Sequence, residues 1–160
     1  MTATAHALVA GAIATRFPDP IAAGLLAFVS HFVMDSIPHW DIGTNWRERP
    51  RHVTGSWAIA ETVIGISAGT LFFASRAPTL TLLVAIVLSL LPDWIEAPWY
   101  MFFARQDKKE PGARAGAWER LTYVIYKAEN MFHTKLQHPF LGVATQVVTV
   151  VFFLQLLEIL

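Results

Sequence analysis

Long apolar stretches separated by short polar connections make up most of this chain. Four of the stretches are long and apolar enough to cross a bilayer, which takes about 20 helical residues. They cover residues 20–37, 56–75, 78–104 and 139–160. We therefore predict an all-α integral membrane protein with about four transmembrane helices.

Two further segments have helical patterns but different expected roles. Residues 3–15 are apolar but too few to span alone, and they lack the basic start and cleavage pattern of a signal peptide. We expect a short amino-terminal helix there, either re-entrant or tucked against the others. Residues 118–132 carry apolar side chains at spacings of three and four, which predicts an amphipathic helix at the membrane interface. No linker divides the chain, so residues 1–160 are predicted to form one helical membrane domain.

The composition agrees with a membrane protein and restricts the chemistry. Hydrophobic residues make up 54% of the chain, charged residues only 15%, and the mean hydropathy is +0.45. Twelve Lys and Arg residues balance twelve Asp and Glu residues, so no overall basic field favours nucleic acid. The absence of cysteine leaves His and carboxylate side chains as the only strong metal ligands.

The basic residues are divided unequally between the two sides of the predicted bundle. Ten of the twelve lie in residues 41–54 and 105–138, and only Arg16 and Arg76 lie on the other side. Positively charged loops are retained on the cytoplasmic side of a membrane. We therefore predict that the 41–54 and 105–138 loops are cytoplasmic.

Ionisable residues of the apolar segments gather at one depth, within roughly 15 Å of the cytoplasmic boundary at a rise of about 1.5 Å per residue. They are His6, His31, Asp35, Glu61, Asp93, Glu96, His133 and His138. The predicted spans contain no Lys or Arg that could pair with the carboxylates. A divalent metal would neutralise several carboxylates and use the imidazoles as ligands. The pair His31/Asp35, at i and i+4, shares a helical face, as does Asp93/Glu96 at i and i+3.

Simpler interpretations of the same residues involve no metal. A single intramembrane His can be a packed, hydrogen-bonded residue, and Glu61 could hydrogen-bond a neighbouring helix while protonated. Pro38 is expected to bend or end its helix. The residues after it lie at or beyond the interface, so we expect solvent exposure for His39, Asp41 and His52. The metal interpretation is favoured because four separate segments contribute to the same layer.

Three short motifs, "ATAHALVAGAIA", "LSLLPDWIE" and "HTKLQHPF", resemble motifs of one family. It is the membrane-bound metal-dependent hydrolase family, also labelled LexA-binding, inner-membrane-associated hydrolases. The matching positions are His6, Asp93, His133 and His138, and a His-x-x-x-Asp motif of the family resembles His31 and Asp35. The match is incomplete: Ile95 replaces a second Asp, and Thr134, Gln137 and Pro139 replace Arg, Thr and Ser. The missing Arg would be a natural phosphate clamp.

Together, the depth of the ionisable residues, the charge bias and the resemblance predict a site near the cytoplasmic face of a bacterial or archaeal inner membrane. Its metal, zinc or else manganese or iron, would be held by His6, His31, Asp35, Asp93, His133 and His138. Glu61 or Glu96 would be the general base. The expected substrate is amphiphilic, such as a lipid-linked phosphate or ester, entering from the membrane lipid. LexA binding has no supporting residue in this chain.

Two other classes of protein remain open at this point. The polar layer could belong to a non-enzymatic subunit that contacts other membrane subunits or binds haem or another pigment. Such a subunit would present a single His on an apolar face, whereas a hydrolase needs mixed His and carboxylate ligands with an open position. An ion pathway is the least supported class, because Arg76 is the only ionisable residue between residues 66 and 89.

Overall fold

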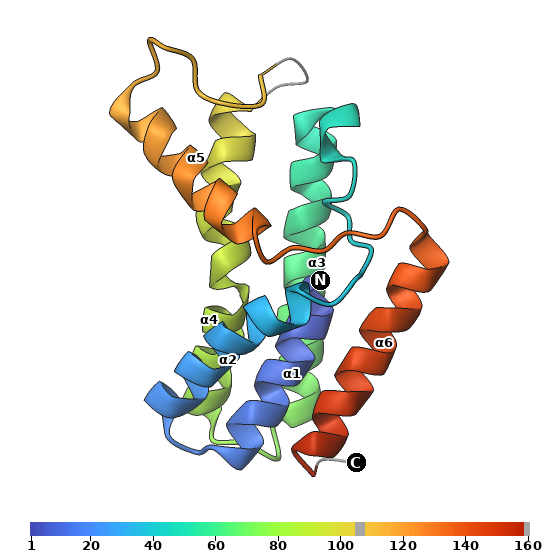
Figure 1. Cartoon of the computed structure of the whole chain (residues 1–160). Helices are drawn as coiled ribbons and strands as arrows, with labels where there is room; N and C mark the ends of the chain where they lie inside the picture. The colour runs from blue at the N-terminus through green and yellow to red at the C-terminus, as the bar shows by residue number, and fades with distance from the viewer. Residues whose placement is uncertain (105–107, 159–160) are drawn as a thin grey trace.

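The computed structural model describes residues 1–104 and 108–158, and all regular secondary structure in these ranges is helical (Figure 1). The all-α prediction is therefore confirmed. Arg105 of the basic loop and residues 159–160 of the last predicted span lie outside the described residues. In chain order the elements are α1 (Ala3–Arg16), α2 (Pro20–Asp35), η1 (Trp46–Glu48), α3 (Arg51–Phe73), α4 (Thr79–Pro98), η2 (Trp99–Phe103), α5 (Ala117–Asn130) and α6 (Pro139–Leu156).

Among the described residues, three helices are long and apolar enough to cross a membrane. They are α3, the continuous helix made of α4 and η2, and α6, with 23, 25 and 18 residues. The predicted first span corresponds to α2, which has 16 residues and ends at Asp35. At about 1.5 Å per residue, α2 is about 24 Å long and shorter than the hydrocarbon core of about 30 Å. Three helices, rather than the predicted four, therefore have spanning length.

The bounds of α2 follow from its local sequence. Asp19 caps the amino-terminal end, where its Oδ1 accepts a hydrogen bond from the Ala22 N–H at 2.7 Å. Pro20 suits the first turn, since it has no N–H to leave unpaired. At the other end, the helix stops at Asp35 because a residue preceding proline avoids the helical conformation and Pro38 follows closely. The segment after Asp35 therefore leaves the helix axis.

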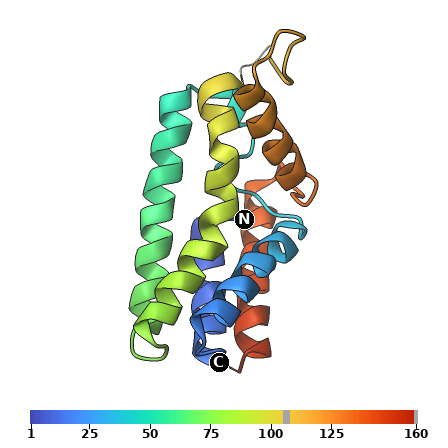
Figure 2. The same ribbon diagram turned by 90° about the vertical axis from the view of Figure 1, so that its left-hand side faces the viewer.

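Helix α1 lies at the centre of the bundle, against α2, α3, α4 and α6 (Figures 1 and 2). Ten of its 14 residues are buried, six of them Ala. Close approach of α3 depends on Gly65 and Gly69: a Cβ on Gly65 would lie 2.7 Å from the Ala3 carbonyl carbon, and one on Gly69 would lie 2.9 Å from the Ala7 oxygen. Small residues at this spacing let two helix backbones pack closely. The expectation that this short helix packs against the others is confirmed.

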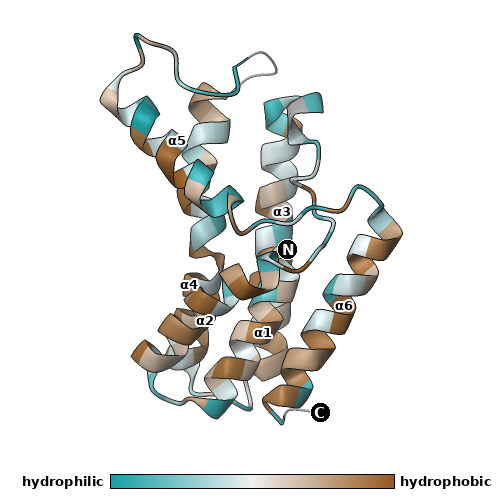
Figure 3. Ribbon diagram, viewed as in Figure 1, coloured by the Kyte–Doolittle hydropathy of each residue, from teal (hydrophilic) through white to brown (hydrophobic). Residues whose placement is uncertain are grey.

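The outer surfaces of the long helices are apolar. Leu71 is 81% exposed, Leu80 65% and Val148 67%. Figure 3 shows hydrophobic residues over the lower part of the bundle and hydrophilic residues at the amino-terminal end of α3 and in the loops. So many exposed apolar side chains are unfavourable in water, which agrees with a membrane protein.

The amphipathic segment forms α5, close to the predicted residues 118–132. It packs against α4 and η2, where the Tyr123 ring lies 4.9 Å from the Trp99 ring (Figure 1). Three of its other apolar residues face outward: Trp118, Leu121 and Val124 are each more than half exposed. This exposed apolar edge suits the predicted position at the membrane interface.

Candidate metal centre

Asp35, at the end of α2, is the hub of a buried cluster of imidazoles. Its Oδ1 lies 3.2 Å from Nε2 of His6 and 3.9 Å from Nε2 of His39. Its Oδ2 lies 3.4 Å from Nε2 of His31 and 3.5 Å from Nε2 of His133. The α-amino group of Met1 also contacts Oδ1. The predicted shared face of His31 and Asp35 is thus confirmed, and three further segments converge on the same carboxylate.

One group of ligand atoms, which we call group 1, consists of His6, His31 and Asp93. Their ligand atoms all lie within 4.8 Å of one another. The imidazoles of His6 and His31 stack with ring centroids 4.1 Å apart, and Nε2 of His31 lies 3.9 Å from Oδ1 of Asp93. These residues come from α1, α2 and α4. Group 1 joins three of the residues that the sequence predicted as metal ligands.

A second group, which we call group 2, consists of His39, Asp41 and His133. The Nε2 atoms of His39 and His133 lie 3.0 Å apart, and Oδ2 of Asp41 is 3.3 Å from the first and 3.1 Å from the second. The ligand atoms of Asp35, His39 and His133 lie within 4.8 Å of one another. Asp35 therefore lies beside imidazoles of both groups.

Backbone pairing brings the two halves of group 2 together. The N–H of His39 donates to the Thr134 carbonyl at 3.0 Å, and the N–H of Leu136 donates back to the His39 carbonyl at 2.6 Å. The N–H of Thr134 also donates to the Asp35 carbonyl, at 2.9 Å. These bonds fix the segment that carries His133 against the end of α2, about 100 residues away in the chain.

Backbone carbonyls also fix the tautomers of two imidazoles. Nδ1 of His31 lies 2.7 Å from the Ser89 carbonyl oxygen, and Nδ1 of His39 lies 2.8 Å from the Ile37 carbonyl oxygen. A carbonyl oxygen only accepts, so each Nδ1 carries the proton and each Nε2 presents a lone pair to the cluster. Metal-binding histidines in proteins are held in this way.

The electrostatics of group 2 favour the protonation states that a metal requires. Burial lowers the pKa of His133 below its ordinary value, despite the hydrogen bond with Asp41. Burial would raise the pKa of Asp41, but the hydrogen bond with His133 and the nearby charge of Lys135 hold it well below its usual range. At neutral pH the imidazole is therefore neutral and the carboxylate ionised, as metal ligands must be.

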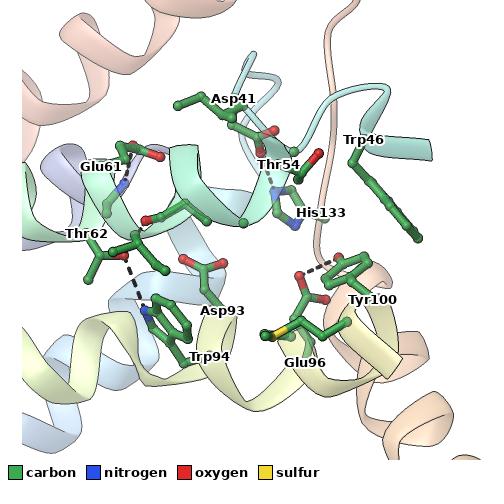
Figure 4. A pocket seen from close by; sticks show the side chains of 18 of the residues that line it. Asp41, Trp46, Thr54, Glu61, Thr62, Asp93, Trp94, Glu96, Tyr100 and His133 are labelled. Atoms are coloured by element: carbon green, nitrogen blue, oxygen red, sulfur yellow. Dashed lines mark hydrogen bonds and ion pairs between the residues drawn. The ribbon is translucent and has the colours of Figure 1, made fainter. Parts of the chain in front are cut away.

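A pocket of about 200 Å³ lies between α3 and α4 and is bordered by residues 41–43 and Trp46 (Figure 4). Asp41, Asp93 and His133 form part of its wall, so both groups reach it. Much of the remaining wall is apolar or aromatic and includes Ile59 and Trp94. Buried His and Asp groups that could hold a metal ion therefore face a largely apolar pocket.

Glu61 and Glu96, the predicted bases, both line this pocket (Figure 4). Oε1 of Glu61 accepts a hydrogen bond from the Ala3 N–H at 2.7 Å. Both oxygens of Glu96 are engaged: Oε1 accepts from the Tyr100 hydroxyl at 2.5 Å and Oε2 from the Asn130 amide at 3.3 Å. Each carboxylate thus holds a neighbouring segment as well as facing the pocket.

Three other sequence expectations have different outcomes. His138 is exposed at the start of α6 and lies outside both groups. His52 is exposed, as expected. The expected exposure of His39 and Asp41 is wrong, because they are only 0% and 6% exposed. The signal that could have identified them is the His-x-Asp spacing directly after the His31/Asp35 helix.

A search against protein-family models, curated protein sequences and solved structures finds no match to this chain. The properties of the site therefore rest on its own residues.

Proposed function

We propose that this chain is a membrane-embedded, metal-dependent hydrolase that cleaves an amphiphilic phosphate or ester. The observation that carries the proposal is the placement of mixed imidazole and carboxylate ligands on the wall of a largely apolar pocket. Hydrolytic metal sites use such ligand sets and keep one side open to substrate. The family resemblance of the "LSLLPDWIE" and "HTKLQHPF" segments agrees with this class.

The metal would be held by His6, His31, Asp35 and Asp93, with His133 beside Oδ2 of Asp35 as a further ligand. Nitrogen and oxygen donors without thiolate suit zinc, manganese or iron, and we favour zinc. A divalent ion there would supply Lewis acidity and a more acidic water.

We assign the general-base role to Glu61. One of its oxygens accepts from a backbone N–H, whereas both oxygens of Glu96 accept hydrogen bonds from side chains. A base needs an accessible lone pair within reach of the water that it deprotonates. Glu96 then positions Tyr100 and Asn130 at the end of the pocket near α5.

The proposed substrate has an apolar portion and an anionic head. Ile59 and Trp94 line the pocket and are also exposed on the outer surface of the bundle, by 56% and 39%. An acyl or prenyl chain could therefore enter from the lipid. Lys135 lines the same pocket, with its Nζ 3.7 Å from Oδ1 of Asp41, and could bind the head group in place of the missing family Arg.

We also propose an orientation of the bundle in the membrane. The site would lie near the cytoplasmic face of a bacterial or archaeal inner membrane, with the 41–54 and 105–138 loops in the cytoplasm. The hydrophilic amino-terminal end of α3 and the hydrophilic loops in Figure 3 support one polar face of the bundle.

A pigment-binding subunit is less well supported. Its signature would be a single His on an apolar face. Each of the four buried imidazoles instead lies within 3.4 Å of a carboxylate oxygen. Such ligand sets favour a hard divalent ion over haem or chlorophyll.

The proposal is tested with the detergent-purified chain, its Asp93→Asn variant and the matched control His138→Ala. We expect bound metal and hydrolysis of a fluorescent lipid phosphate or a long-chain nitrophenyl ester in the wild type. Asp93→Asn should lose most of both, whereas His138→Ala should retain both, because His138 lies outside the metal groups. A well-folded wild type that takes up no metal when zinc, manganese and iron are offered would refute the proposal.

A further inference from the structure

We infer that the centre holds two metal ions and that Asp35 is shared between them. The inference rests on the proposed metal-dependent function and adds His39 and Asp41, which the sequence did not predict, to the ligand set. One ion would lie at group 1 and the other at group 2.

The number of ligands exceeds what one ion can use. Seven side chains surround the centre: His6, His31, Asp35, His39, Asp41, Asp93 and His133. A first-row divalent ion takes about four to six ligands, and a catalytic ion leaves at least one position open. Division into two groups of three with Asp35 common to both gives each ion a usual ligand number.

The position of Asp35 fits a shared carboxylate. Each of its oxygens lies beside one imidazole from each group: Oδ1 beside His6 and His39, and Oδ2 beside His31 and His133. The Asp35 side chain is only 4% exposed, so its charge is compensated within the cluster, where the α-amino group of Met1 also contacts Oδ1.

Each group contains an imidazole that a backbone carbonyl holds with its Nε2 lone pair facing the cluster, as in metal-binding histidines. In group 1 the Ser89 carbonyl fixes His31, and in group 2 the Ile37 carbonyl fixes His39, so that both Nε2 lone pairs face the cluster. In group 2 the Nε2 atoms of His39 and His133 are only 3.0 Å apart, beside Oδ2 of Asp41. Lone pairs this close repel unless a proton or a cation lies among them.

Group 1 has an additional unpaired atom. Nδ1 of His6 is buried and has no hydrogen-bond partner in the described part of the chain, while its Nε2 faces Asp35. A buried polar atom without a partner is costly, and a bound ion is one way to satisfy it. Group 1 therefore has a buried unpaired nitrogen, and group 2 has two close Nε2 atoms that need a proton or a cation between them, in addition to their acidic residues.

A metal pair also narrows the substrate class. Paired ions about 3.5–4 Å apart stabilise both the attacking and the leaving oxygen in phosphate-ester cleavage. Lys135, beside Asp41, adds a positive charge on the group 2 side of the pocket. We therefore expect a phosphate ester with an apolar tail to be preferred over a carboxylic ester.

The test counts metal ions in the full-length chain, purified in detergent, stripped and reloaded with Mn²⁺. The group 1 variant is His31→Ala/Asp93→Asn, and the group 2 variant is His39→Ala/Asp41→Asn. The matched control is His52→Ala/His138→Ala, which changes two exposed imidazoles. Elemental analysis gives the stoichiometry, electron paramagnetic resonance reports whether the Mn²⁺ ions are exchange-coupled, and circular dichroism checks the fold.

We expect about two ions per chain with a coupled spectrum in the wild type and the control, and about one uncoupled ion in each group variant. One ion per wild-type chain, or two ions without coupling, would overturn the shared pair and leave the proposed hydrolase standing. No ion in the wild type would overturn both proposals. The wild-type measurement decides the question even if a variant fails to fold.

Discussion

Glu61 and Glu96 face one pocket from two helices, and their hydrogen bonds separate their expected roles. Glu61 bonds to the backbone N–H of Ala3, and Glu96 bonds to the side chains of Tyr100 and Asn130. A carboxylate whose two oxygens both accept hydrogen bonds holds its surroundings in place, but it is a weaker proton acceptor.

Substituting these residues by glutamine tests the assignment. Glu61→Gln should lower kcat by about 10²–10⁴-fold, because the amide can still accept from Ala3 but cannot take a proton. Glu96→Gln should lower kcat by no more than about tenfold, since its carbonyl oxygen can still accept the Tyr100 hydrogen bond. Both variants should keep the metal content of the wild type. Equal losses of kcat, or loss of metal from Glu61→Gln, would contradict the assignment.

Residues in regular helices were predictable, but residues that reach the site through tertiary pairing were not. The spacing of His31 and Asp35 places them on one face of α2, and the structure confirms this. His39 and Asp41 come after the helix, in a segment whose position depends on hydrogen bonds with residues 134–136. The His-x-Asp spacing alone does not encode that tertiary pairing, so the sequence predicted solvent exposure for two residues that are buried.

At the scale of the helices, the contact between α1 and α3 supports the site. α1 carries His6, and its backbone approaches α3 at Gly65 so closely that a Cβ there would lie 2.7 Å from the Ala3 carbonyl carbon. Any side chain at Gly65 must push the two helices apart. Because Glu61 bonds to the N–H of Ala3 one turn away, the same displacement would reach the pocket.

Gly65→Ala is therefore expected to destabilise the protein by about 1–3 kcal/mol, as overpacking does elsewhere. It should also weaken metal binding, because His6 moves with α1. Gly55→Ala is the matched control on the same helix, since a Cβ there meets nothing within 4 Å. It should be neutral or stabilising by up to about 1 kcal/mol. Thermal unfolding in detergent and metal titration measure both effects, and equal behaviour of the two variants would contradict the role of this contact.

Hydropathy predicted the lengths of three helices well but overestimated the length of α2. The three longest apolar segments form α3, α4 with η2, and α6. The stretch from residue 20 is equally apolar, but its helix stops at Asp35 after 16 residues. Hydropathy measures composition, whereas the end of this helix is set by Pro38 and by the buried ligands around Asp35. A run of apolar residues therefore overestimated the length of the helix.

Over the whole molecule, the candidate metal ligands converge because α1 and α2 are short. Their ends stop within the bundle, with the amino terminus near mid-height in Figures 1 and 2, while α3 and α4 continue past them. The space above the short helices is where residues 39–46 and 133–135 enter and where the pocket forms. Full-length spans at these positions would fill that space with helix, so the shorter helices make the site possible.

The orientation of the whole bundle can be tested because the chain contains no cysteine. Ser75→Cys places one thiol at the exposed α3–α4 turn, and Gly112→Cys places one in the basic loop, where an added Cβ meets nothing within 4 Å. If the basic loops are cytoplasmic, a membrane-impermeant maleimide added to intact spheroplasts should label Ser75→Cys and leave Gly112→Cys unlabelled. Both variants should be labelled after lysis. The opposite pattern would place the metal centre near the outer face, and labelling of both in intact cells would be incompatible with a bundle that crosses the membrane.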